Sequence, residues 1–214
     1  MPNARIAELV VGGTTEPWQR LGLEFVDNSA LIGTVRLRVI PFLNPGIQSV
    51  GIAGLDEHDH NEGACDHDHG PRPSMVHGAP IHHCEPTDLV VSNTLDARLI
   101  DHVVLMTPDL ERTCEAVAAV TGAPLKRIRE APPVRQGFFR LGEVILEVVQ
   151  SPQVQHPAAK WWGLVITVGN LDTVCASLGP EVMGPPKAAV QPGRFIATVR
   201  AELGLGIPVA LMSA

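Results

Sequence analysis

The stretch LIDHVVLM (99–106), followed by TPDLERTCEAVAAVTG (107–122), has the pattern of a strand that leads into a helix. Its first part is rich in β-branched and apolar residues, as strands are. The Thr-Pro-Asp that follows is a helix-start signal, because Thr can cap free backbone amides and Pro suits the first turn. Apolar and small side chains then recur at helical spacing until Gly122, which predicts a helix that ends at this glycine.

The same order of elements recurs 61 residues further along the chain. TPDLERTC (107–114) lies over VGNLDTVC (168–175), so the last part of the chain is an internal repeat of a strand, a helix and three strands. Cys114 and Cys175 fall at the same helical position, which favours small buried residues over metal ligands. The predicted strands and the second helix lie at 125–130, 137–141, 144–149, 162–168, 170–178 (the helix), 181–183, 194–199 and 207–212.

The N-terminal part has a weaker version of this pattern. We expect a strand at 6–11, a short helix at 16–22 and strands at 34–40 and 46–55. Residues 1–55 are therefore interpreted as a third, degenerate copy of the module.

Between these parts lies a compositional island. Residues 56–88 hold eight acids and one base, which equals the whole net charge of −7, since the other 15 acids and 15 bases cancel. The island has no strand or helix period and few large apolar residues, so it cannot bury enough surface to offset the entropy of ordering. We expect residues 56–98 to form a flexible surface insertion.

The island is also rich in residues that bind transition metals. Neutral imidazoles and thiolates are preferred ligands of zinc, copper, nickel and cobalt, although the spacing matches no zinc-finger pattern. A metal-binding loop and a solvated acidic linker therefore both remain open. The candidate loop ligands are His58, His60, Cys65, His67, His69, His77, His82, His83 and Cys84.

The composition excludes several classes of function. With 4% aromatic residues, no Tyr and a net charge of −7, the 214-residue chain is not expected to bind nucleic acid. No window approaches the roughly 18 to 20 apolar residues of a membrane-spanning helix, and the start lacks a secretory signal. Four Cys are too sparse for a disulfide framework. We therefore expect a cytoplasmic protein.

The C-terminal pattern resembles the two βαβββ modules of the vicinal oxygen chelate superfamily, which includes glyoxalase I, bleomycin-resistance proteins and extradiol dioxygenases. The resemblance implies an α+β fold with a curved mixed sheet, in a domain at 99–214 built of modules 99–150 and 161–214. It extends only weakly to the N-terminal part. It is carried by IDHVVLMTPDLERTCEAVAAVTG (100–122), RQGFFRLGEVILEVVQSP (135–152), WWGLVITVGNLD (161–172), QPGRFIATVR (191–200) and GIPVALMS (206–213).

In that superfamily a divalent ion lies in a U-shaped trough and chelates neighbouring substrate oxygens, which it activates as a Lewis acid. The resemblance implies metal ligands at His102 on the first strand and at Glu147 on the fourth, with Glu147 also a candidate general base. A zinc, nickel, cobalt, iron or manganese ion would fit. His102 is expected to share its strand face with Ile100, and the plainer alternative is a core His bonded to the carboxylate.

The second module departs from the family pattern. Gly163 takes the place of the His, and Ala210 or a neighbour takes the place of the Glu. Because an open tetrahedral site normally uses three protein ligands, a further ligand is needed. We consider Glu8, the island or a second subunit as its source. Three copies of a module that works in pairs leave one unmatched, which indicates either a homodimer or a copy that packs outside the trough.

Other residues are candidates to bind the substrate in the trough, namely Gln136, Phe138, Arg140 and Trp162. Arg194 and Arg200 could pair with an anionic substrate or simply lie at a solvated strand edge. The leading hypothesis is a metal-dependent enzyme, a lyase, isomerase or dioxygenase, on a small oxygen-rich organic molecule. The alternatives are a non-catalytic small-molecule binding protein of the bleomycin-resistance type, and a metal-handling protein that uses the island.

Overall fold

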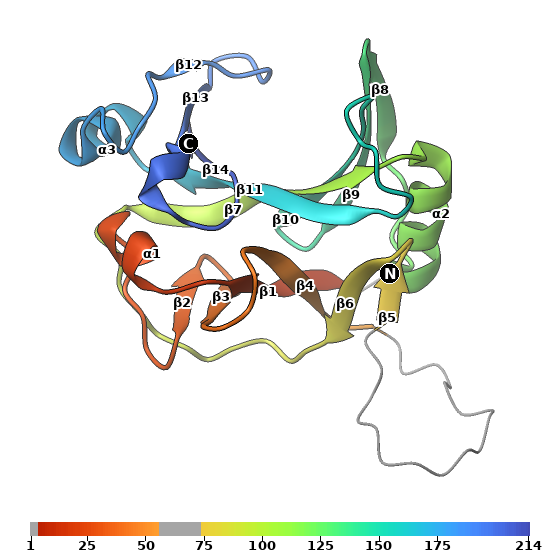
Figure 1. Ribbon diagram of the computed structural model, residues 1–214, viewed down its shortest axis with the longest axis horizontal. Coiled ribbons are helices and arrows are strands. Elements are labelled where there is room, and N and C mark those ends of the chain that lie inside the picture. The colour runs from red at the N-terminus through yellow and green to blue at the C-terminus, as the bar shows by residue number, and fades with distance from the viewer. Residues whose placement is uncertain (1–3, 56–73) are drawn as a thin grey trace.

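The protein consists of two β-sheets stacked face to face, as seen in a computed structural model that describes residues 4–55 and 74–214 (Figure 1). The eight-stranded sheet is curved, and the six-stranded sheet lies below its convex side. One continuous apolar core fills the space between them. The concave side of the larger sheet is left open.

The eight-stranded sheet is made of two βαβββ modules. In each module the first strand pairs with the fourth in parallel, and the third and second strands follow in antiparallel order. The antiparallel pair β7–β11 joins the modules. This α+β arrangement confirms the predicted fold class. The elements are β7 (Ala97–Thr107), α2 (Leu110–Thr121), β8 (Arg127–Ala131), β9 (Val134–Leu141) and β10 (Val144–Gln150), then β11 (Lys160–Val168), α3 (Leu171–Leu178), β12 (Lys187–Ala188), β13 (Phe195–Thr198), the 3-10 turn η1 (Ala201–Leu203) and β14 (Val209–Ser213).

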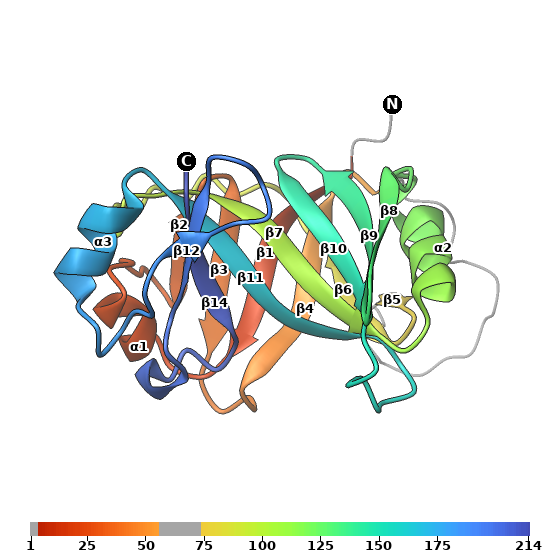
Figure 2. The same cartoon turned by 90° about the horizontal axis from the view of Figure 1, so that it is seen from above.

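The two helices start at equivalent residues, and each is followed by a glycine. Asp109 caps α2 through the backbone amide of Arg112, and Asn170 caps α3 in the same way. The cap of α2 is thus Asp109 and not Thr107, whose hydroxyl instead accepts from the Asp109 amide at 3.1 Å. Gly122 ends α2 in the left-handed conformation that glycine adopts without strain. The helices lie at opposite ends of the curved sheet (Figure 2). Among the described residues no helix is long and apolar enough to cross a membrane.

The six-stranded sheet differs from the predicted third copy. The predicted strands and helix of the first part are present, together with a strand at Ser29–Ile32 that was not predicted. However, β4 pairs antiparallel with β1, while β3 takes the parallel place beside β1. β4 therefore begins a second unit with β5 and β6, in the same order as β1, β2 and β3. The elements are β1 (Arg5–Gly12), α1 (Glu16–Arg20), β2 (Ser29–Ile32), β3 (Val35–Ile40), β4 (Gly46–Ala53), β5 (Ser74–Val76) and β6 (Ala79–His83).

The hairpin β5–β6 falls inside the segment 56–98 that the composition predicts to be an insertion outside the folded sheets. Its alternating buried side chains are only three, Val76, Ala79 and Ile81, and the His and Pro residues between them hide the period. His77 and Gly78 form its turn with positive φ angles of 47° and 91°. A left-handed conformation at both positions is typical of a two-residue hairpin turn.

The two sheets are joined by a hydrogen bond from Trp161, whose indole Nε1 donates to the carbonyl of Pro80 at 2.8 Å. We expect Trp161→Phe to lower the free energy of unfolding by about 1 to 2 kcal/mol, because it leaves that carbonyl without its donor. The neighbouring Trp162 is 51% exposed, so Trp162→Phe should change it by less than about 0.5 kcal/mol. Urea unfolding followed by circular dichroism compares the two variants, and equal effects would refute this role for Trp161.

Candidate functional site

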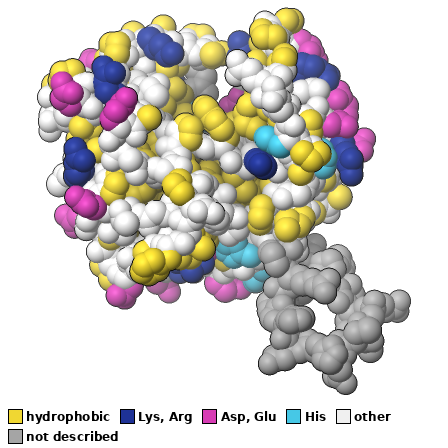
Figure 3. Space-filling view, viewed as in Figure 1, with side chains coloured by type: hydrophobic (Ala, Val, Ile, Leu, Met, Phe, Trp, Pro, Cys, Tyr) yellow, Lys and Arg dark blue, Asp and Glu magenta, His cyan; other side chains and the backbone are white. Residues whose placement is uncertain are grey.

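The concave face of the eight-stranded sheet contains two adjoining hollows with volumes of about 430 and 460 Å³. We call them together the trough. The space-filling view shows the opening between the two raised ends of the sheet, with apolar side chains at its base (Figure 3). Four side chains line both hollows and so mark the centre of the trough: His102, Gln136, Glu147 and Ile196.

His102 and Glu147 come from neighbouring parallel strands. In the register of β7 and β10, His102 lies opposite Ile145 and Glu147 opposite Val104, so both side chains project from the same face. His102 Nε2 lies 3.5 Å from Glu147 Oε2, and the side chains are 18% and 13% exposed. The structure thus brings together the two residues that the sequence pairs as ligands.

A bulge in β7 gives His102 a partner on its other ring nitrogen. Val165 of β11 faces His102 and Ile166 faces Ile100, so Asp101 is the extra residue between them. Its carboxylate lies 2.8 Å from His102 Nδ1 and 2.6 Å from Arg194 Nη1. Asp101 therefore fixes the orientation of the imidazole, and Arg194 fixes Asp101.

This arrangement sets the charge of the pair at the centre. With Nδ1–H donated to Asp101, a neutral His102 presents the lone pair of Nε2 toward the trough and toward Glu147. Glu147 Oε1 accepts a hydrogen bond from Gln136 Nε2, and Oε2 faces the imidazole. A proton shared between these two electron-rich atoms, or a metal ion bound by both, removes their mutual repulsion.

The Asp101 carboxylate is ionised under all physiological conditions. Burial acts to raise its pKa, but the hydrogen bonds from His102 and Arg194, together with their positive charge, lower the pKa to about 2. A permanent carboxylate behind a histidine is the usual outer partner of a metal-binding imidazole.

The second module cannot provide the matching pair of ligands. Val165 faces Ala210 as Val104 faces Glu147, so Ala210 occupies the place of the second carboxylate, as predicted. At Gly163 a Cβ atom would lie 2.4 Å from the carbonyl oxygen of Pro208, which leaves no room for a His side chain. Of the residues described, the central donors are therefore His102, Glu147 and the amide of Gln136.

Of the four residues predicted to bind the substrate, three line the trough and one does not. Gln136, Phe138 and Trp162 line the trough. Arg140 does not line it, since its Nε donates to the carbonyl of Gly142 at the end of the strand. A second bulge, at Trp162, turns this side chain inward while Trp161 faces the smaller sheet.

Glu8 lies on the six-stranded sheet and does not line the trough, contrary to the expectation of a third ligand there. Its carboxylate is 2% exposed and accepts hydrogen bonds from Arg36 Nε at 2.6 Å and Arg38 Nε at 3.1 Å. His82 Nε2 lies 2.8 Å from its other oxygen. The sequence places Glu8 on a strand but does not show that this strand belongs to the sheet without the trough.

Four of the candidate loop ligands are described; His82 and Cys84 both lie against Gly51, whereas His77 and His83 have other neighbours. His77 Nδ1 lies 2.6 Å from Thr113 Oγ1, His82 contacts Glu8, His83 is 3.9 Å from Glu85, and Cys84 is buried against Gly51. Within 4–55 and 74–214 no three His, Cys, Asp or Glu side chains form a metal-binding group. The remaining candidates lie outside the described residues: His58, His60, Cys65, His67 and His69.

Several trough residues were not singled out from the sequence. Asp101 was missed because its role depends on the bulge. Arg127 and Arg129 on β8, together with Lys187 on β12, also line the trough. The sequence Arg-Ile-Arg at 127–129 could have indicated them weakly, because in a strand both arginines must project from the same face.

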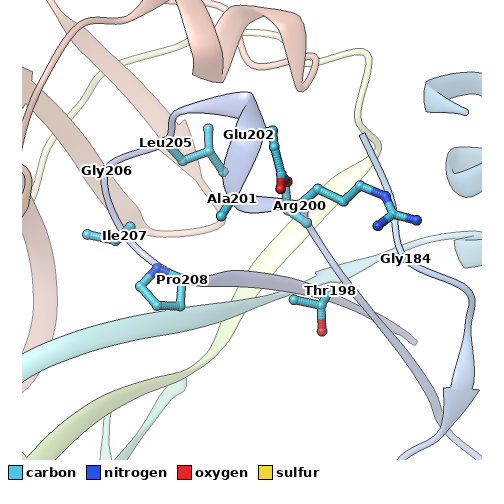
Figure 4. Close-up of a pocket in the computed structure, with 10 residues that line it drawn as sticks. Gly184, Thr198, Arg200, Ala201, Glu202, Leu205, Gly206, Ile207 and Pro208 are labelled. Carbon is cyan, nitrogen blue, oxygen red and sulfur yellow. The ribbon is translucent and has the colours of Figure 1, made fainter. Parts of the chain in front are cut away.

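Of the two arginines considered as anion partners, neither is free in the trough. Arg194 is held by Asp101, and Arg200 Nε donates to the carbonyl of Pro180. Arg200 lines another pocket, of about 620 Å³, which shares Thr198 and Pro208 with the trough. Figure 4 shows Arg200 and Glu202 on one side of this pocket, with Thr198 and Pro208 nearer the sheet.

Comparisons with known proteins find similarity among solved structures. No family model matches the sequence, and no curated protein matches it. Among solved structures, a methylmalonyl-CoA epimerase from Mycobacterium tuberculosis is 13% identical, with 55% of this chain and 89% of that chain covered and a TM-score of 0.47. A Streptomyces coelicolor methylmalonyl-CoA epimerase in complex with 2-nitronate-propionyl-CoA is 16% identical, covering 54% and 96% at 0.44. A hypothetical protein from Bacillus halodurans is 12% identical, covering 54% and 93% at 0.45.

The modules and their pairing settle the architecture. The C-terminal domain consists of two paired βαβββ modules whose strands form one curved sheet. At the identities and scores above, the similar structures say nothing about what this chain binds or catalyses. That question rests on the trough and on its side chains.

Proposed function

We propose that the protein is a divalent-metal-dependent enzyme that acts on a small oxygen-rich organic molecule in the trough. The supporting observation is that His102 Nε2 and Glu147 Oε2 lie 3.5 Å apart in the trough, while Nδ1 of the same imidazole is hydrogen-bonded to Asp101. Imidazole nitrogen and carboxylate oxygen are donors that zinc, nickel, cobalt, iron and manganese accept. Gln136, in contact with Glu147, adds an amide oxygen when its side-chain amide is turned over.

The residues of the trough have distinct roles in this proposal. His102, Glu147 and Gln136 hold the ion, and Asp101 keeps the imidazole in the tautomer that binds it. When bound, the ion would supply Lewis-acid activation of neighbouring substrate oxygens. Glu147 is the one acid among the described residues that line the two hollows, so it is also the candidate to take up or return a substrate proton.

A specific observation favours a second candidate, a non-catalytic protein that binds a small molecule. Gly163 and Ala210 stand where the second module would supply ligands, and a site with so few protein ligands holds an ion weakly. In this candidate His102 is protonated and forms an ion pair with Glu147. A metal-handling role of the His-rich segment remains a prediction, because most of its ligands lie outside the described residues.

Metal titration distinguishes these candidates. We expect the wild type to bind one more Co²⁺ ion per chain than the double variant His102→Ala, Glu147→Ala, since this ion needs both side chains. Asp101→Asn should lower the affinity for that ion about 10- to 100-fold, because it removes the carboxylate that is bonded to the imidazole of His102. Isothermal titration calorimetry and the Co²⁺ absorption spectrum provide the readout.

The matched control for this titration is His156→Ala, which removes an imidazole remote from the trough whose Nδ1 contacts the carbonyl of Ala158. It should leave stoichiometry and affinity unchanged. An equal number of ions in the wild type and the double variant would reject the metal-dependent enzyme and leave the binding protein or the metal-handling protein. A cytoplasmic location and a homodimer are further parts of this proposal.

A further inference from the structure

The wall of the trough carries positive charges with no described acidic partner. Arg127 and Arg129 of β8 line one of its hollows, and Lys187 of β12 lines the same hollow from the opposite end of the sheet. Arg127 stacks on the ring of Phe138 at 4.7 Å, and Arg129 contacts only the amide oxygen of Gln136, at 3.5 Å. Lys or Arg side chains lie on both raised ends of the molecule in Figure 3.

Several arginines elsewhere in the described chain are paired with acids. Arg135 forms ion pairs with Glu111 and Glu130, and Arg194 forms one with Asp101. The three cations of the trough form no ion pair with a described acid, and Glu147, the one acid that lines the hollow, is bonded to Gln136. Unpaired cations that converge on one hollow favour an anion there.

The adjoining hollow is apolar. Its walls are mainly the side chains of Val104, Met106, Val149, Trp162 and Leu164, at the other side of the shared residues His102 and Glu147. Trp162 is half-exposed, and its ring offers a flat surface to a ligand. The trough therefore has three zones in a row: an apolar zone, the His102–Glu147 centre and a cationic zone.

We infer that the ligand of the trough is an elongated organic anion, with an apolar group against Trp162, an oxygen-bearing group at His102 and Glu147, and a carboxylate or phosphate at Arg127, Arg129 and Lys187. This inference rests on the proposed function in taking the trough as the substrate site. It adds the charge and the orientation of the substrate. Carboxylates and phosphates share the geometry that guanidinium groups bind.

A pair of fluorescent probes tests the inference in metal-free protein. The probe 8-anilinonaphthalene-1-sulfonate carries an anionic group on an apolar ring system, and N-phenyl-1-naphthylamine has the same rings without the charge. We expect the triple variant Arg127→Gln, Arg129→Gln, Lys187→Gln to lose at least tenfold in affinity for the sulfonate and less than twofold for the neutral amine. Trp162→Ala should weaken the binding of both probes.

The control is Arg112→Gln, which removes one exposed cation of α2 outside the trough and should leave both affinities unchanged. Displacement of the sulfonate by hexanoate or by hexyl phosphate then tells a carboxylate from a phosphate, and hexanol should displace it least. Equal loss for both probes in the triple variant, or no loss, would overturn the inference. Because no metal is present, failure of the Co²⁺ titration leaves this result unaffected, so the two proposals fail separately.

Discussion

Gly163→Ala should lower the free energy of unfolding by about 2 to 4 kcal/mol, although it adds a single methyl group. Gly163 lies in β11 at the centre of the sheet, where its Cβ would meet the carbonyl oxygen of Pro208 at 2.4 Å. That carbonyl accepts the backbone hydrogen bond of Leu164 at 3.1 Å, so it cannot move away without loss of the pairing with β14. The clash is between backbone and Cβ, and no rotamer relieves it.

Urea unfolding at pH 7 measures this effect, and Gly184→Ala is the matched control. At Gly184 the nearest contact of a Cβ is 3.3 Å, to the carbonyl of Thr198, so a change below about 1 kcal/mol is expected. Similar losses in both variants would contradict the special crowding at Gly163. A large loss would also mean that the missing histidine ligand of the second module cannot be restored by substitution at this position.

The sequence predicts most of the large sheet because its signals are local and repeated. The offset of 61 residues places Gly163 on His102 and Val165 on Val104, and the register of the two strand pairs then places Ala210 opposite Val165 as Glu147 lies opposite Val104. The short β12 at 187–188 is not predicted, since two exposed residues leave no period to detect. Extended structure is expected instead at 181–183, where the chain forms turns and a single bridge from Met183.

The inner geometry of the site could not be predicted, because it depends on one extra residue. A regular strand would place Ile100 and His102 on the same face, as expected from the sequence. The bulge at Asp101 instead leaves Ile100 fully buried in the core and His102 in the trough. Asp101 is this extra residue, and the bulge places its carboxylate next to His102 and next to Arg194, which is 93 positions away in the sequence. No local pattern carries that information.

Acidification should destabilise the protein by several kcal/mol between about pH 4.5 and pH 2, chiefly through Glu8 and Asp101. Burial acts to raise the pKa of Glu8, but the hydrogen bonds of His82 and Arg38 and the charges of Arg38 and Arg36 lower it from 4.5 to about 2. The pKa of Asp101 falls from 3.8 to about 2. Shifts of this size correspond to about 3 and 2 kcal/mol, respectively.

The sign of the pH effect follows from whether the folded or the unfolded protein binds a proton more readily at each carboxylate. Both carboxylates have a lower pKa in the folded than in the unfolded protein, so their contribution is complete above the unfolded values and is lost as the pH falls toward 2. Glu8→Gln should therefore reduce the free energy of unfolding at pH 7 and have little effect at pH 2.5. The exposed Glu181→Gln should leave the pH profile unchanged. The measurement is urea unfolding of the wild type between pH 5 and pH 2.5. A free energy of unfolding that stays constant over this range would refute the ion-pair networks at both sites, because the lowered pKa values require the unfolded protein to take up protons at Glu8 and Asp101 before the folded protein does.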